Sequence, residues 1–295
     1  MQKAVKGTLC AMLAGIVWGT MSIFVENLKG IGVSTMSIVF LRTTITAVFL
    51  GVCLSVFKPT LLKIKLKDIW IFLGNGILSL VFFTFCYFNA IVKSSAAIAA
   101  VLLYTAPVFV MLLSLIFFKE RLTKLKLLAC GIAILGCILT SGLLESKSTV
   151  SIEGILFGLA SGFCYALYSI FTGVAIKKGY SSLTIIFYSF LFACLASMPL
   201  ADLKNTLPVI FSSWSPILYT LGMGVVTAII PYFLYTTALN NIEASKASII
   251  ASIELVVASL VGYLCFGQGL SFISIVGIIL VLLSIVILNV KFKRN

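Results

Sequence analysis

Two charged side chains, Arg42 and Glu254, lie deep inside apolar stretches of this sequence. A charge at the centre of a membrane helix costs about 2.5–3.5 kcal/mol, so each is expected to face the protein interior or a water-filled cavity. A carboxylate in such a place can exchange a proton or hold a cationic group. An arginine there can pair with the carboxylate, or donate to backbone carbonyls or lipid headgroups. The expected depths allow an Arg42–Glu254 pair without requiring it.

Aromatic side chains near the middle of the apolar stretches form a second group with a shared chemistry. They are Trp18, Tyr87, Tyr104, Tyr165, Tyr168, Tyr232 and Tyr235. A tyrosine placed away from the membrane surface needs a partner for its hydroxyl. As a set, these rings and Glu254 predict a cavity for a flat or cationic organic solute, bound by stacking and cation–π contact. For any single ring, packing in the core is an equal alternative.

Two prolines and one asparagine join the candidate site. Pro107 and Pro231 each remove a backbone hydrogen bond and are expected to kink their helices. The freed carbonyls are tolerated in a membrane only where protein or cavity water satisfies them. Asn75, one turn before Ser79, could add a polar contact to the same cavity or form a hydrogen bond between helices.

Other chemistry is disfavoured by what the sequence lacks. It contains no histidine, and none of its eight cysteines belongs to a C-x-x-C pair. Catalytic and metal sites therefore lose their commonest acid–base and ligand side chain. We expect no enzymatic activity, no metal and no cofactor.

The elements that carry these residues are long apolar segments. Hydrophobic residues make up 61% of the chain and charged residues 10%, against roughly 25% charged in a soluble domain. A helix needs roughly 20 apolar residues to cross a bilayer, and these continuous runs lack the alternation of a barrel. The sequence predicts an all-α integral membrane protein with ten transmembrane helices, at 7–25, 34–56, 69–91, 95–118, 125–141, 154–176, 182–201, 215–239, 246–266 and 271–290.

The second half of the sequence repeats the first at an offset of 147 or 148 residues. The matched segments are 7–24 with 154–171, 73–76 with 221–224, and 117–122 with 265–270. Because five predicted helices separate the copies, the second five-helix repeat must be inverted relative to the first. We assign the repeats to 1–145 and 146–295. Inverted repeats are typical of secondary transporters, whose substrate site lies near the membrane midplane.

The net charge of +13 indicates an orientation in the membrane and not a nucleic-acid partner. Sixteen basic residues fall on the side of the termini, and only four, Lys29, Lys93, Lys147 and Lys204, fall on the other side. Cytoplasmic loops carry the excess of Lys and Arg, so we expect a multi-pass protein of the cell membrane with both termini cytoplasmic. The basic residues would then face anionic lipids of the cytoplasmic leaflet.

Three segments resemble a known family. They read WGTMSIF at Trp18–Phe24, FLR at Phe40–Arg42, and YTAPVFVMLLSLIFFKERLTKLKLLACGIAILGCIL at Tyr104–Leu139. Over nearly its whole length the chain resembles the ten-helix exporters with two EamA domains in the drug/metabolite transporter superfamily. Its Ser252–Glu254 segment is similar to the glutamate motif of the second domain. Leu255 stands in place of the usual proline there, and Gln268 stands where a second helix-end glutamate is common.

The resemblance implies export of small organic metabolites, such as amino acids, by alternating access. The central cavity would be lined by Trp18, Tyr104, Tyr165 and Glu254. The transport would be driven either by proton antiport, with Glu254 as the titrating group, or by the solute gradient alone. Two alternatives are an importer of a quaternary ammonium solute such as choline, and a non-transporting membrane protein. Two repeats can enclose a cavity within one chain, so a monomer would suffice.

Overall fold

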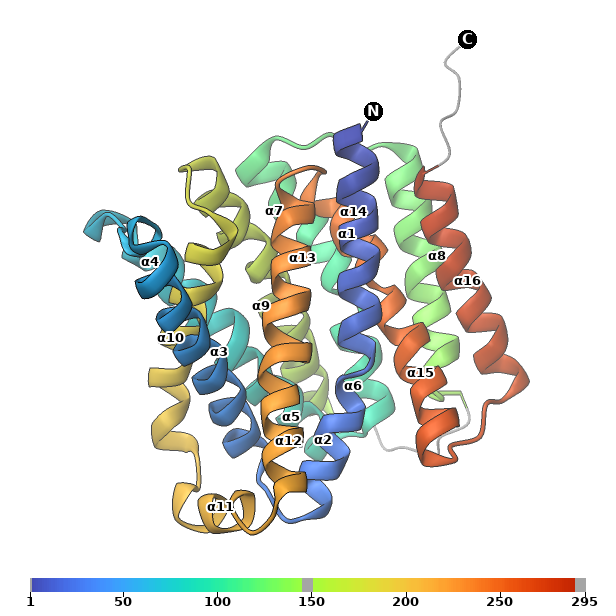
Figure 1. Ribbon diagram of the computed structural model, residues 1–295. Helices are drawn as coiled ribbons and strands as arrows, with labels where there is room; N and C mark the ends of the chain where they lie inside the picture. Colours follow the sequence, from blue (N-terminus) through green and yellow to red (C-terminus); the bar gives the residue numbers. More distant parts are fainter. Residues whose placement is uncertain (1, 145–150, 290–295) are drawn as a thin grey trace.

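The computed structural model describes residues 2–144 and 151–289, and every regular element in that part of the chain is a helix. The helices form one bundle, and most of them run between the same two ends of the molecule (Figure 1). Nine helical stretches of the described residues are long and apolar enough to cross a membrane: Gln2–Gly30, Thr35–Phe57, Leu66–Lys93, Ala96–Phe118, Ile152–Lys177, Ser182–Leu200, Trp214–Leu239, Ala244–Phe266 and Phe272–Asn289. The predicted all-helical membrane fold is therefore confirmed.

The remaining predicted span, 125–141, forms the 17-residue helix α8 (Lys124–Thr140), which lies beside α16 (Phe272–Asn289) (Figure 1). At 1.5 Å per residue, α8 is about 25 Å long. The count of ten spans therefore stays a prediction. The assigned boundary between the repeats, at 145–146, lies outside the described residues. The same is true of four residues used in the charge argument, Lys147, Lys291, Lys293 and Arg294.

Five of the described spans are interrupted, and four others are continuous. The interrupted spans are α1 (Gln2–Gly19) with α2 (Met21–Gly30), α4 (Ile69–Leu73) with α5 (Phe83–Lys93), α6 (Ala96–Leu103) with α7 (Ala106–Phe118), α12 (Trp214–Gly224) with α13 (Ile230–Leu239), and α14 (Ala244–Ala251) with α15 (Ile253–Phe266). The continuous spans are α3 (Thr35–Phe57), α9 (Ile152–Lys177), α10 (Ser182–Ser197, extended by a short turn to Leu200) and α16. The short helix α11 (Leu203–Ile210) lies at the end of the bundle opposite the N-terminus (Figure 1).

The interruptions recur in the two halves at the offset found in the sequence. The break at Tyr104, between α6 and α7, corresponds to the break at Ser252, between α14 and α15, 148 residues later. π-helical segments at Gly74–Phe82 and Val225–Ile229 overlap at the same offset. Segments of this kind are frequent at functional sites. Both halves therefore carry similar local irregularities at corresponding positions.

Prolines accompany some of these interruptions but not all of them. Pro107 lies in the first turn of α7, and Pro231 lies in the first turn of α13. The break at Ser252 has no proline in the turn that follows it, because Leu255 occupies the position that corresponds to Pro107. The sequence therefore predicts a kink at the two prolines but gives no sign of the break at Ser252.

Gly15 and Gly162 allow the helices α1 and α9 to pass close to the two corresponding breaks. A Cβ atom placed on Gly15 of α1 would lie 2.7 Å from the carbonyl oxygen of Ala251, at the end of α14. A Cβ atom placed on Gly162 of α9 would lie 2.8 Å from the carbonyl oxygen of Leu102, at the end of α6. Small residues let membrane helices approach at the backbone, so each break is packed against a helix of the other half.

A proline at position 255 tests whether the Ser252 break is independent of proline. The Leu255 N–H donates only to the Ser252 carbonyl, at 3.1 Å, and the first turn of a helix tolerates proline. We expect Leu255→Pro to lower the free energy of unfolding no further than Leu255→Ala, because both variants lose the packing of the buried Leu255 side chain and the backbone cost of this proline is small. Leu260→Pro, in the interior of α15, should cost about 3 kcal/mol or more beyond Leu260→Ala. Thermal unfolding of the four variants in detergent measures both differences, and an equal cost of proline at the two positions would contradict a break at Ser252.

Candidate functional site

A small cavity lies where the α6–α7 break meets the α14–α15 break. Its lining includes Tyr104, Pro107, Tyr165, Ser248, Ser252 and Glu254, and we call it the Glu254 cavity. Its volume is about 20 Å³. A water molecule needs roughly 10–15 Å³ on this measure, whereas ligand pockets usually span roughly 300–1,000 Å³. The cavity therefore has room for water but not for an organic solute, and the protein is closed around it.

Glu254 is the charged group of this cavity. It lies in the first turn of α15, where the helix dipole favours a negative charge. One carboxylate oxygen accepts a hydrogen bond from the Tyr165 hydroxyl, with an O–O distance of 3.3 Å. Among the described residues that line the cavity there is no lysine, no arginine and no second carboxylate. An ammonium group that entered would meet this carboxylate beside two tyrosine rings.

Pro107 changes the backbone hydrogen bonding beside the Glu254 cavity. Pro107 has no N–H, so it cannot donate to the carbonyl of Leu103, four residues earlier. Leu103 also lines the Glu254 cavity. Pro107 thus leaves a residue of the cavity lining without its usual helical hydrogen bond.

Arg42 forms its hydrogen bond with the backbone of the α12–α13 span and not with Glu254. Its guanidinium donates to the Thr227 carbonyl at 2.7 Å and lies 5.5 Å from the centre of the Tyr232 ring. The Thr227 carbonyl is the one that Pro231 cannot bond, because proline has no N–H. In the part of the chain that the structure describes, the ion pairs do not include Arg42 with Glu254. Arg42 therefore satisfies the backbone at the interrupted span α12–α13.

Replacing Arg42 should weaken the fold at that contact. A hydrogen bond from a charged donor contributes about 1.5–3 kcal/mol, and Arg42→Met would leave the Thr227 carbonyl without this donor. We expect a lower unfolding temperature for Arg42→Met in detergent, with part of the loss recovered by Arg42→Lys, which keeps a charged donor. An unchanged unfolding temperature in Arg42→Met would show that the contact contributes nothing.

Four of the aromatic residues pack against one another beside the cavity and do not line it. The ring centroids of Trp18 and Tyr232 are 5.1 Å apart, those of Tyr168 and Tyr232 are 4.9 Å apart, and those of Trp18 and Tyr235 are 5.3 Å apart. All four side chains are buried. The Tyr235 hydroxyl forms a hydrogen bond with the Ser169 hydroxyl, with an O–O distance of 2.9 Å. A protein side chain therefore supplies the partner that this buried tyrosine needs. In this closed state these rings form a packed aromatic cluster.

The last two candidates, Tyr87 and Asn75, do not line the cavity either. Tyr87 stacks on Phe83, whose ring centroid lies 5.5 Å from that of Tyr165. Asn75 is fully buried and donates to Thr172 and Ser189, at 3.1 and 3.0 Å. It thus forms the hydrogen bonds between helices that the sequence left as one of two alternatives.

Sequence reasoning missed the serines of the site. Ser248 and Ser252 line the cavity, and Ser245 lies one turn before them. The spacing of these serines, at i, i+3 and i+7, places them on one face of α14 and of the residue that follows it. Glu254 comes two residues after the last of them. A polar stripe that leads to a buried carboxylate was the signal that could have found them.

Comparisons with known proteins identify a family, related sequences and a similar fold. The EamA-like transporter family matches at residues 5–142 and 152–290. An uncharacterized transporter of Archaeoglobus fulgidus is 31% identical, over 95% of both chains. The pseudopaline exporter CntI of Pseudomonas aeruginosa is 23% identical, over 96% of this chain and 95% of its own. A crystal structure covering 96% of both chains superposes with a TM-score of 0.78 at 16% identity, which supports the fold alone.

Both halves of the chain match the family, and the related proteins are named as transporters and not as enzymes. The apolar helices make it a multi-pass membrane protein. The chain is therefore a membrane transporter that belongs to the EamA-like transporter family.

Proposed function

We propose that this transporter exports small organic metabolites that carry an ammonium group, such as amino acids and related compounds, across the cell membrane by alternating access. The observation that carries the proposal is the Glu254 cavity, with one carboxylate, two tyrosine rings and no basic side chain among its described lining residues. A multiply charged anion would be repelled there. The pseudopaline exporter among the relatives supports the outward direction.

The proposed architecture is ten transmembrane helices in two inverted five-helix repeats, with α8 as the tenth. The interruptions that correspond at an offset of 148 residues support the repeat. Thr8, in the first half of α1, donates to Asn289 at the end of α16, at 3.3 Å, and this contact supports an even number of spans with both ends of the chain on one side. By the charge rule, this side is cytoplasmic and faces anionic lipids. One chain supplies every residue of the cavity, so a monomer suffices.

Proton antiport is the coupling that the site supports best. Glu254 can exchange a proton when the cavity opens to water, and binding of a cation would compete with that proton. The protein would then switch between its inward-open and outward-open states with either a proton or a substrate bound at Glu254. Alternating access requires movement at the paired breaks, because the closed cavity of about 20 Å³ cannot hold a solute.

A carboxylate beside tyrosine rings also suits a quaternary ammonium ion, which has no N–H to donate. An importer of choline or a similar solute is therefore the second candidate. The two candidates differ in substrate, so a single flux measurement separates them.

The test is uptake of labelled amino acids and of choline into proteoliposomes that contain the purified protein, with and without a pH gradient. Saturable amino-acid flux that the gradient stimulates would support the proposal. Saturable flux of choline alone would favour the importer. If the folded protein moved neither solute above empty vesicles, the proposed substrate class would be wrong.

A further inference from the structure

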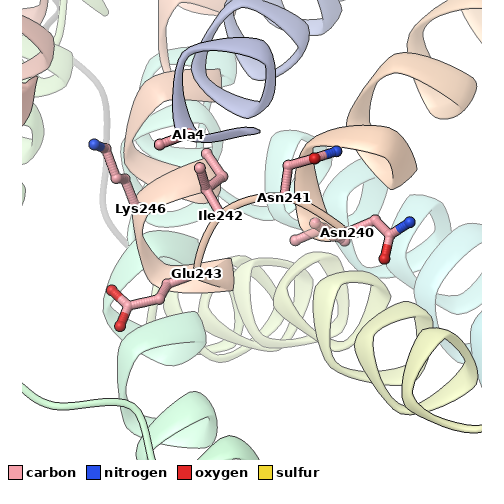
Figure 2. Close-up of a pocket in the computed structure, with 7 residues that line it drawn as sticks. Ala4, Asn240, Asn241, Ile242, Glu243 and Lys246 are labelled. Atoms are coloured by element: carbon pink, nitrogen blue, oxygen red, sulfur yellow. The ribbon is translucent and has the colours of Figure 1, made fainter. Parts of the chain in front are cut away.

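An open recess lies at the end of the molecule that carries the N-terminus. Its volume is about 490 Å³, and Ala4 of α1, Asn240, Glu243 and Lys246 line it (Figure 2). We call it the Lys246 recess. It is a shallow depression, open to the surroundings, with the polar side chains of Asn240, Glu243 and Lys246 in its lining. The Glu254 cavity, by contrast, is closed.

A single short helix connects the recess with the cavity. Lys246, in the first turn of α14, lines the recess, while Ser248, Ala251 and the break at Ser252 line the cavity. The eight residues of α14 span only about 12 Å. The recess and the cavity therefore share one short helix as part of their walls.

A buried carboxylate from the other half of the chain holds the start of α14. Glu120, just after α7, accepts the N–H of Ala244 at 2.8 Å and the N–H of Ser245 at 3.3 Å, and it also accepts the Ser245 hydroxyl. The first N–H groups of a helix have no partner within the helix, so this carboxylate satisfies two of them. Hydrogen bonds to a charged acceptor are among the stronger ones.

Lys126 completes the latch, which we define as Glu120, Lys126 and Ser245. The Lys126 ammonium lies 3.6 Å from Glu120 and 2.6 Å from Glu243, and it donates to the Arg121 carbonyl at 3.1 Å. Glu120 and Lys126 are 8% and 7% exposed, so water screens their interaction little. The pair with Glu243 ties the start of α8 to the residue before α14, and the pair with Glu120 lies within the α7–α8 connection.

The corresponding position in the second half has no such latch. Gln268 stands 148 residues after Glu120 and is exposed, whereas the Glu120 side chain is buried. The start of α6 is capped by its own Ser95, whose hydroxyl accepts the Ile98 N–H at 3.2 Å. The nearest ion pair, Lys93 with Glu153, is 47% and 65% exposed, and exposed pairs contribute little.

We propose that α14 is the gate between the Lys246 recess and the Glu254 cavity, and that the latch keeps this gate closed. The break at Ser252 is the hinge, because the backbone bonds of α14 end there and α15 begins anew. When the latch opens, the serine face of α14 forms the path by which a solute reaches Glu254 from the N-terminal side. This inference rests on the proposed transport function, since a gate needs a transported solute.

The first test measures backbone hydrogen exchange in α14. Glu120→Gln keeps the shape of the side chain but replaces one acceptor oxygen with a donor and removes the charge. Loss of charge-assisted bonds to two N–H groups should make exchange at 244–251 about tenfold faster or more. The matched control is Glu153→Gln, at the other end of the molecule, which should leave exchange in α14 unchanged. Unchanged exchange in Glu120→Gln would overturn the latch.

A second test separates a gate from a simple helix cap. Ser248→Cys places a thiol in the closed cavity, and an impermeant maleimide is added from one side of sealed vesicles. Mass spectrometry of the peptide around 248 distinguishes this thiol from the native cysteines. With Glu120→Gln, labelling from the N-terminal side should rise about tenfold and labelling from the other side should not. Equal labelling with and without Glu120→Gln, or an equal rise from both sides, would overturn the gate.

If Glu120→Gln fails to fold, a milder variant of the latch replaces it. Ser245→Ala removes only the hydroxyl donor of the latch, and a several-fold rise in sided labelling is expected from it. Failure of the gate and failure of the transport proposal remain distinguishable. Unchanged labelling in a protein with measurable solute flux would overturn the gate alone. A sided rise in labelling, in a protein that moves no solute, would leave the gate standing and count against the proposed function.

Discussion

Glu254→Gln should lose nearly all saturable transport while keeping the fold. Glutamine has the same shape and can still accept the Tyr165 hydroxyl, so packing around the cavity is preserved. The charge is lost, and with it the interaction with an ammonium group. A hydrogen bond to a charged partner contributes about 1.5–3 kcal/mol, which corresponds to roughly 10- to 150-fold weaker binding of the substrate.

Initial uptake rates in proteoliposomes measure this loss, with Glu26→Gln as the matched control. Glu26 is an exposed carboxylate on α2, and its replacement should leave transport unchanged. Glu254→Asp keeps the charge at a shorter reach and should retain part of the activity. If Glu254→Gln transports at the normal rate and keeps its full pH dependence, Glu254 has neither the binding role nor the coupling role.

Gly136→Leu should prevent normal folding of the α8–α16 pair. A Cβ atom on Gly136 would lie 2.8 Å from the Gly277 carbonyl oxygen and 2.9 Å from the Val281 backbone nitrogen. Backbone atoms cannot move aside as a flexible side chain does, so the two helices would have to separate. Overpacking a core usually costs about 1–3 kcal/mol, and separating a helix pair should reach or exceed the upper value.

The same helix provides the control for this prediction. Gly131 is exposed, and a Cβ atom placed there would meet nothing within 4 Å. Gly131→Leu adds the same side chain to α8 and should leave the yield of monodisperse protein and its unfolding temperature nearly unchanged. Equal behaviour of the two variants would show that the close contact between α8 and α16 is not needed for the fold.

The length and composition of apolar segments were sufficient to predict the fold class. Segments of about 20 apolar residues have few alternatives to membrane helices, because every backbone group must be satisfied internally. The interruptions were harder to predict. Pro107 and Pro231 mark two of them. The break at Ser252 has no proline, and its close contact with Gly15 joins residues more than 200 positions apart in the sequence.

The candidate site could be predicted only in part for a similar reason. Tyr104, Tyr165, Pro107 and Glu254 meet at one cavity. Trp18, Tyr168, Tyr232 and Tyr235 pack with one another, and nothing in their spacing distinguishes these two arrangements. Helical periodicity indicates which face of a helix points inward, but not which helix it meets. Glu120 looks like an ordinary charged residue at a helix end, because the residues that donate hydrogen bonds to it, Ala244 and Ser245, lie 124 and 125 residues away.

The closed state of the Glu254 cavity affects how a substrate should be sought. With about 20 Å³ available, only the fraction of molecules that have opened can bind. The apparent dissociation constant is then the intrinsic constant divided by that fraction, so a true substrate can score poorly in an equilibrium screen. A weak signal from the native protein is therefore no reason to discard a compound. A variant held open would bind the same compound more tightly without gaining a single contact to it.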